Sequence, residues 1–93
     1  MVSPLQREIL EYLEANYPHR VRLQYLVEAL GLDEETLVTE LHALQAEKLV
    51  ELTRYKAEGT QEIRIHSVKL SERGWILLSE LRESEYESEP HGG

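Results

Sequence analysis

Cysteine is missing from the 93 residues, and its absence removes two kinds of architecture. Without thiols the chain can form neither a disulfide framework nor a thiolate metal site. Its four histidines are scattered, with no pair four residues apart and no carboxylate at ligand spacing. We therefore expect no metal site in this protein.

Catalytic motifs are missing as well. The chain contains no Gly-rich phosphate-binding loop, no G-x-S-x-G elbow and no cysteine nucleophile. Its many carboxylates follow exposed helical positions, so a catalytic pair cannot be distinguished from a solvated surface. We expect a protein that is not an enzyme and that needs no cofactor.

Long apolar runs are also lacking. No stretch approaches the roughly 18 residues that would cross a membrane, and Met1 is not followed by a positively charged and then apolar leader. We therefore expect a cytoplasmic protein without membrane contact. The hydrophobic fraction is 41%, with Leu dominant and Phe absent, and a chain of 93 residues can build one modest core.

Positive charge is scarce and unevenly placed. Ten basic and 18 acidic residues give a net charge of −8. Residues 1–50 carry 4 basic and 9 acidic groups, residues 71–93 carry 2 and 6, and residues 51–70 carry 4 and 3. Only the middle segment is not acidic, so a polyanion would be met there and repelled elsewhere.

The first half of the chain predicts two helices. Ser3 and Gln6 form a capping box with proline at the first helical position, and an apolar face continues from there until Pro18 ends the helix. The second helix follows Val21, which could form a very short strand. Gly31 ends this helix as a left-handed C-cap.

A third helix begins directly after a short turn. Asp33 is a good N-cap, and Glu34 and Glu35 suit the positive end of the helix dipole. The buried stripe is leucine-rich and consists of Leu37, Leu41 and Leu44, with Val38 alongside. Helix, short turn and helix together predict a helix-turn-helix unit.

Residues 50–70 change to a strand pattern on both sides of Gly59, which predicts a hairpin with its tip at Glu58–Thr60. With this tip, Tyr55 faces Ile63 and Arg54 faces Arg64. A slip of one residue would pair Tyr55 with Arg64 and break the apolar face, so we expect the first register.

The end of the hairpin and the last helix follow from two further patterns. The apolar phase shifts between Ile65 and Val68, which indicates a bulge or the end of the strand near Ser67. Ser71 then caps a helix whose core face carries leucines at positions 77, 78 and 81. We expect a folded domain over residues 3–83 and a disordered acidic tail over residues 84–93.

Two stretches carry a family resemblance. Residues 22–52, RLQYLVEALGLDEETLVTELHALQAEKLVEL, resemble the pattern in which a helix, a Gly-Leu turn and a recognition helix lead into the first wing strand. Residues 68–81, VKLSERGWILLSEL, resemble the wing exit of multiple-antibiotic-resistance-repressor-like (MarR-like) regulators. The resemblance implies a winged helix-turn-helix, mainly α with a small β-hairpin (α+β), ordered helix, short strand, helix, helix, strand, strand, helix.

The chain departs from this pattern at three places. The recognition helix has no arginine on its outward face. Lys48 stands where glycine commonly ends that helix, and Arg22 stands where Ser or Thr often caps the helix before it. These departures leave the fold unaffected but weaken the prediction of base reading.

The resemblance implies two sets of DNA-contacting residues. In the predicted register the basic side chains of the wing share one face, where they could meet phosphates; they are Arg54, Lys56, Arg64 and His66, with Lys69 extending the patch. The alternative is a solvated β face balanced by nearby glutamates. The residues of the recognition helix that could reach bases are Glu35, Thr36, Thr39, Glu40, His42 and Ala43.

A dimer interface is expected on the terminal helices. Trp75 and Ile76 lie off the core stripe of the last helix, and adjacent exposed apolar residues usually mark an interface. Leu10 and Tyr17 lie off the main stripe of the first helix and could join them. The alternative is that Trp75 packs on the wing base within one chain.

Two functions remain open from the sequence. The first is sequence-dependent binding of duplex DNA by a homodimeric transcriptional regulator, with the wing on phosphates and the recognition helix in the major groove. The second is a protein–protein interaction module whose acidic recognition helix docks a basic partner.

Overall fold

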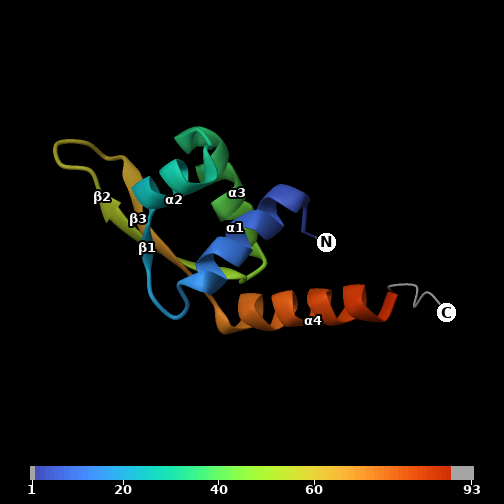
Figure 1. The fold of residues 1–93 in the computed structure, drawn as a ribbon. Helices are drawn as coiled ribbons and strands as arrows, with labels where there is room; N and C mark the ends of the chain where they lie inside the picture. Colours follow the sequence, from blue (N-terminus) through green and yellow to red (C-terminus); the bar gives the residue numbers. More distant parts are fainter. Residues whose placement is uncertain (1, 89–93) are drawn as a thin grey trace.

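The computed structural model describes residues 2–88 and has four helices and three strands within that range (Figure 1). In chain order these are α1 (Pro4–Ala15), β1 (Val21–Arg22), α2 (Leu23–Leu30), α3 (Glu34–Ala46), β2 (Val50–Lys56), β3 (Ile63–Leu70) and α4 (Glu72–Ser88). This order confirms the expected winged helix-turn-helix, including the very short strand at Val21. No described helix is long and apolar enough to cross a membrane.

The helix ends follow the chemistry of their caps. The Ser3 hydroxyl accepts from the Gln6 backbone N–H at 3.1 Å, while the Gln6 side chain accepts from the Ser3 N–H at 3.1 Å. Asp33 caps α3 by accepting from the Thr36 N–H at 3.0 Å. Arg22 occupies the N-cap of α2 without a side-chain hydrogen bond, and Gly31 ends that helix with φ 65°. Each predicted cap is confirmed.

The three strands form one antiparallel sheet in the order β1-β3-β2. Residues paired across two strands have their side chains on the same face of the sheet, and successive residues of one strand alternate between the two faces. The buried side chains therefore define an inner face, which is directed toward the helices. Figure 1 shows the helices gathered on that side. The side chains with no exposed surface come from α1, α2, α3, β3 and α4, and they are Ile9, Leu10, Leu13, Leu26, Leu37, Leu41, Leu44, Val68, Leu70 and Leu78.

The predicted hairpin register is wrong by one residue. Tyr55 pairs with Arg64, and Arg54 pairs with Ile65. The reason is the length of the loop between the strands. The Ala57 N–H donates to the Glu62 carbonyl at 2.9 Å, so four residues, 58–61, form the loop instead of the three expected. The register that we had rejected from the apolar pattern is therefore the one that forms.

A β-bulge explains why the apolar pattern was misleading. Thr53 pairs with Ser67 while Arg54 pairs with Ile65, so His66 is an extra residue in β3. Its insertion places both Ile65 and Val68 on the inner face, although they are three positions apart. The bulge expected near Ser67 is confirmed, and the strand continues beyond it to Leu70.

The junction between α3 and the sheet is fixed by backbone contacts. Lys48 has φ 63°, the left-handed conformation that usually selects glycine at the end of a helix. The Ser71 hydroxyl donates to the Lys48 carbonyl at 2.7 Å and accepts from the Gly74 N–H at 3.0 Å. A Cβ on Gly74 would lie 2.2 Å from the Leu49 carbonyl oxygen. The start of α4 therefore sits directly against the end of α3.

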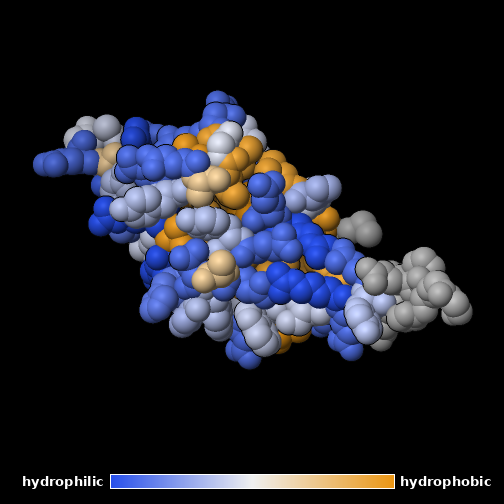
Figure 2. All heavy atoms as spheres, viewed as in Figure 1, coloured by the Kyte–Doolittle hydropathy of each residue, from blue (hydrophilic) through white to orange (hydrophobic). Residues whose placement is uncertain are grey.

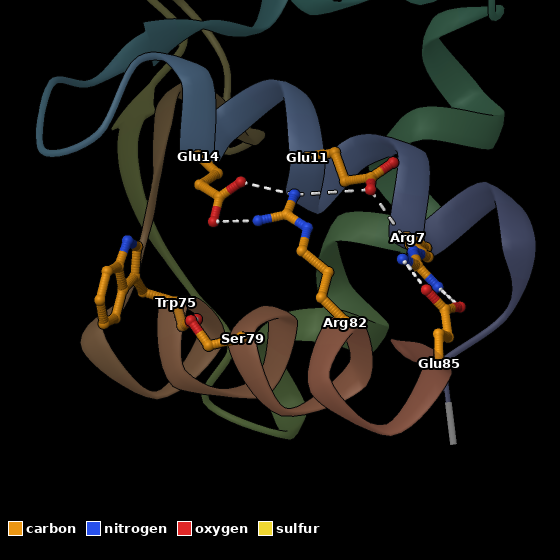
Figure 3. A network of polar contacts seen from close by, with 7 residues as sticks. All are labelled: Arg7, Glu11, Glu14, Trp75, Ser79, Arg82 and Glu85. Atoms are coloured by element: carbon orange, nitrogen blue, oxygen red, sulfur yellow. Dashed lines mark hydrogen bonds and ion pairs between the residues drawn. The ribbon is translucent and has the colours of Figure 1, made fainter. Parts of the chain in front are cut away.

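Helix α4 lies antiparallel to α1 and is joined to it by ion pairs (Figure 3). Arg82 contacts Glu14 at 2.7 Å and Glu11 at 3.5 Å. One turn further along α4, the Glu85 carboxylate accepts hydrogen bonds from both Nη groups of Arg7. Helix α4 continues to Ser88, so residues 84–88, which were expected to begin a disordered tail, are helical. Residues 89–93 of the expected tail lie outside the described residues.

Candidate nucleic-acid interface

The outward face of α3 carries the residues expected to read bases. Glu35, Thr39, His42 and Ala43 are exposed, while Thr36 and Glu40 are half-buried. Helix α3 also packs on β2 through its buried leucines, which leaves these side chains on the opposite side of the helix. The face contains two carboxylates and no arginine or lysine.

The two threonines of this face already use their hydroxyl protons within the helix. Thr36 Oγ1 donates to the Asp33 carboxylate at 2.7 Å, and Thr39 Oγ1 donates to the Glu35 carbonyl at 3.0 Å. A hydroxyl has one proton and two acceptor lone pairs, so each threonine can still accept a hydrogen bond. With Glu35 and Glu40 as further acceptors, α3 presents mainly acceptor groups.

Two wing cations lie on the α3 side of the hairpin. Arg54 and Lys56 alternate with Tyr55 and continue the inner face of β2 beyond the buried core. The Arg54 guanidinium donates to the Gln45 side chain, which projects from the end of α3. Both cations are exposed, and Arg54 is held beside the recognition helix.

The other two predicted wing residues lie on the opposite side of the sheet. Arg64 is paired with Tyr55, and the His66 ring contacts the Tyr55 ring edge to face with centroids 6.2 Å apart. The prediction that Arg54, Lys56, Arg64 and His66 share one face is therefore wrong. It depended on the three-residue loop, and the four-residue loop moves Arg64 to the other face.

Lys69 does not extend a patch toward the wing tip. It lies at the base of the hairpin opposite Glu51, and its ammonium group is 3.8 Å from that carboxylate. Near the tip, Glu58 lies in the loop and Glu62 directly follows it, and Arg64 contacts the Glu62 carboxylate at 3.2 Å. The wing of this protein is thus basic along its strands and acidic at its tip.

Hydrogen bonding shifts the ionisation of two groups in this region. The Thr36 hydroxyl and backbone N–H lower the pKa of Asp33, so the α3 cap is charged at neutral pH. The hydrogen bond that Arg64 donates to the Glu62 carboxylate raises the pKa of Arg64. Within residues 2–88, no group of three or more His, Asp and Glu side chains could hold a metal ion.

The residues expected at a dimer interface are only partly accessible. Trp75 is 45% exposed, Ile76 is 44% exposed and Tyr17 is 39% exposed. Leu10 has no exposed surface and belongs to the hydrophobic core of the chain. Leu10 is therefore a core residue, and its assignment to an intermolecular interface is wrong.

Sequence reasoning missed Gln45 and the pairing of α1 with α4. Gln45 lies in the last turn of α3, where its amide could form hydrogen bonds with solvent or with a neighbouring side chain. That the neighbour is Arg54 follows only from the fold. The spacing of Arg7, Glu11 and Glu14 on one helix and Arg82 and Glu85 on another is compatible with an antiparallel pair. That signal was available in the sequence and was not used.

Comparison with solved structures identifies the fold. A MepR mutant from a multidrug resistant S. aureus clinical isolate is 22% identical, with a TM-score of 0.72 over 92% of this chain and 59% of that one. The adhesin competence repressor AdcR from Streptococcus pyogenes is 20% identical, with a TM-score of 0.65 over 94% of this chain and 60% of that one.

A third similar structure contains nucleic acid. It is an S. aureus MepR mutant bound to an oligodeoxyribonucleotide, 20% identical, with a TM-score of 0.65 over 97% of this chain and 67% of that one. No protein-family model and no curated protein sequence matches this chain. The chain spans about 60% of the length of the first MepR structure and of AdcR. It has the winged helix-turn-helix fold that its resemblance to MarR-like regulators implied.

Proposed function

We propose that the protein binds duplex DNA as a small transcriptional regulator, with α3 in the major groove and Arg54 and Lys56 on the flanking phosphates. The observation that carries the proposal is the placement of both cations beside α3 on the inner side of the wing. A DNA-bound protein of the same fold supports it. The wing cations and the N-terminal dipole of α3 must offset repulsion between the α3 carboxylates and DNA.

The acceptor-rich face of α3 limits which bases it can read. In the major groove, cytosine and adenine present amino donors, whereas guanine presents two acceptors. Glu35 and Glu40 can accept from cytosine, and Thr36 and Thr39 retain acceptor lone pairs. Ala43 can contact a thymine methyl group, and His42 is the remaining polar group. The target site is therefore expected to place cytosine or adenine amino groups opposite α3.

Selection from a random duplex pool at low salt tests this proposal. Sequencing over several rounds should reveal an enriched motif containing cytosine or adenine at the positions opposite α3. Replacing the guanines of that motif by 7-deazaguanine should leave affinity unchanged, because no arginine is present to use guanine N7. Absence of enrichment from a folded protein would contradict sequence-dependent binding.

We also propose that the protein is a homodimer that uses the exposed side of α4. Ile76 borders a groove of about 680 Å³ between the start of α1 and α4, and the apolar part of its wall includes Val2, Leu49 and Leu77. Trp75, which precedes Ile76 in α4, and Tyr17, which follows α1, are also exposed aromatic residues. Two linked subunits would bind two half-sites and gain affinity by avidity.

Solution mass tests the dimer. Light scattering should give twice the chain mass, and Ile76→Glu with Trp75→Ala should give the mass of one chain without loss of helical circular dichroism. A wild-type protein that stays monomeric at high concentration would contradict the dimer. An enriched DNA motif with two inverted half-sites would support it independently.

A second function is favoured by one specific observation, the acidic outward face of α3. As an interaction module the protein would place Glu35 and Glu40 against a basic protein partner, with exposed Tyr25 of α2 nearby in the helix-turn-helix unit. Glu35→Lys with Glu40→Lys should abolish such a complex and should strengthen non-specific DNA binding. Survival of the complex would exclude this face as the docking surface.

A further inference from the structure

The side of the sheet away from the helices has a composition that the proposed duplex contacts do not use. We define this outer face by the strand pairing and by the ring contact of His66. Its residues are Arg22, Glu51, Thr53, Tyr55, Arg64, His66, Ser67 and Lys69. The buried apolar side chains of the sheet all lie on the other face, and Figure 1 shows the helices gathered there.

We infer that the outer face binds single-stranded nucleic acid, with an unpaired base stacked on Tyr55 and phosphates contacted by Arg22 and Arg64. This site lies on the other face of the hairpin from Arg54 and Lys56, and Arg64 is within electrostatic range of Glu34 at the start of α3. The site would take a partner in which bases are unstacked and accessible.

Tyr55 provides the stacking surface. Its side chain is 46% exposed near the end of β2, an edge strand of the sheet, so a partner can reach it. The His66 ring lies perpendicular to the Tyr55 ring, with centroids 6.2 Å apart. An exposed ring can stack with any base, because every base has a π face.

The charges of the outer face match a phosphate backbone. Arg22 is exposed, and no ion pair is found for it within residues 2–88. Arg64 contacts Glu62 through one exposed pair at 3.2 Å, and surface pairs of this kind are readily exchanged for another anion. Lys69 and Glu51 neutralise each other at the base of the sheet. With Glu51 and Glu62 set against Arg22, Arg64 and Lys69, the outer face has one more basic than acidic group in a protein of net charge −8.

These groups lie on three adjacent strands, with Arg64 on β3 between Tyr55 on β2 and Arg22 on β1. Arg22 pairs with Ser67, and the bulge at His66 leaves Ser67 only two steps of the β2 ladder from Arg64. At about 3.3 Å per step this separates the two arginine positions by roughly 7 Å along the strands. Tyr55 lies directly opposite Arg64. A strand of nucleic acid crossing the sheet here can contact the ring and both guanidinium groups together.

Figure 2 shows mainly hydrophilic residues over the wing, whereas apolar residues emerge mostly between the helices. This distribution distinguishes the wing from the apolar groove beside α4. A polar surface with one exposed aromatic ring suits a solvated, charged partner better than a protein core. The chemistry of the outer face thus favours nucleic acid over a second copy of the chain.

Fluorescence anisotropy with a labelled oligothymidylate and the full chain at low salt tests this site. Wild-type protein should bind, and Tyr55→Ala should weaken binding about tenfold, in the range measured for loss of one base–aromatic stack. Tyr55→Phe keeps the ring and should bind like the wild type. Arg22→Ala with Arg64→Ala should reduce the salt slope by about 1.4, because two contacts to a single strand are removed.

The inner face supplies the matched control. Arg54→Ala with Lys56→Ala removes the same charge from the same sheet and should leave oligothymidylate binding within about twofold while weakening duplex binding. If the inner-face and the outer-face double variants lose oligothymidylate affinity equally, the assignment to the outer face is overturned. The absence of oligothymidylate binding, or unchanged binding by Tyr55→Ala, would also overturn it. If Tyr55→Ala fails to fold, the arginine pair still decides the question.

Discussion

At the scale of single residues, the close approach at Gly74 determines how the last helix meets the domain. Gly74 lies in the first turn of α4, and its N–H is bonded to the Ser71 hydroxyl. An added Cβ would lie 2.2 Å from a backbone oxygen of Leu49 and 2.8 Å from Leu70 Cδ1. The glycine in the wing-exit pattern is thus needed for space, since its neighbour is backbone that cannot move aside cheaply.

Gly74→Ala should lower the free energy of unfolding by about 2 kcal/mol, within the usual range for overpacking. The methyl group would push α4 away from the α3–β2 junction and disturb the Ser71 cap. Urea denaturation followed by circular dichroism measures the change. Ser79→Ala, an exposed position on the same helix, should stay within about 0.5 kcal/mol of the wild type. Equal stability of Gly74→Ala and the wild type would show that the junction is looser than described.

At the scale of elements, the start of α3 depends on a charged cap. Hydrogen bonds from the Thr36 side chain and backbone lower the pKa of Asp33 below its ordinary value near 4. A carboxylate with a lowered pKa contributes stability above its unfolded pKa and loses it as pH falls through the folded pKa. The contribution of Asp33 is therefore complete at neutral pH and disappears below about pH 4.

Asp33→Ala should destabilise the protein at pH 7, and the difference from the wild type should shrink as pH falls below about 4. Thermal unfolding over a pH series measures this convergence. Asp33→Asn retains a capping side chain without the charge and should lose less stability than Asp33→Ala at pH 7. A constant difference between the wild type and Asp33→Ala at all pH values would mean that the carboxylate charge plays no part in the cap.

The contact between α3 and the wing is also an element-scale feature. Gln45 accepts a hydrogen bond from Arg54, so the wing cation is held relative to the recognition helix. If Arg54 contacts phosphate, Gln45→Ala should weaken duplex binding a few-fold in the wild type and have no effect in an Arg54→Ala background. A double-mutant cycle on duplex affinity measures this coupling. Independent, additive losses would show that Gln45 does not act through Arg54.

The helices of this fold were predictable from sequence because their caps and apolar stripes are local signals. Ser3, Asp33 and Ser71 cap the helices that they were expected to cap. The hairpin register was not predictable in the same way. It depends on a loop closed between Ala57 and Glu62, and the bulge at His66 then realigns the apolar residues. A shift of one residue changed which cations share a face, and so changed the candidate site.

At the scale of the whole molecule, α4 is held along α1 by opposite charges. The hydrogen bond to Glu85 raises the pKa of Arg7 and lowers that of Glu85, and Glu14 raises the pKa of Arg82. The spacing of these charges on each helix is compatible with an antiparallel pair, but the partner of each charge is fixed only once the two helices lie side by side. In this arrangement Leu10 is buried within one chain, and Trp75 and Ile76 remain at the surface.

The charge of the whole molecule sets the conditions for DNA binding. The net charge is −8, and the outward face of α3 adds carboxylates where DNA would lie. Long-range repulsion falls with added salt, whereas the release of counterions from DNA by the wing cations weakens binding as salt rises. The number of phosphates contacted by the wing therefore determines how steeply duplex affinity falls as salt is added.

The salt dependence of duplex affinity is the most direct measurement of the central claim, that Arg54 and Lys56 join α3 in binding duplex DNA. Affinity for the selected duplex is measured across a salt series for the wild type, for Arg54→Ala with Lys56→Ala, and for Arg73→Ala on α4 as a control. The account predicts weaker binding and a slope reduced by about 2 for the double variant, with the control unchanged. An unchanged slope in the double variant would contradict it.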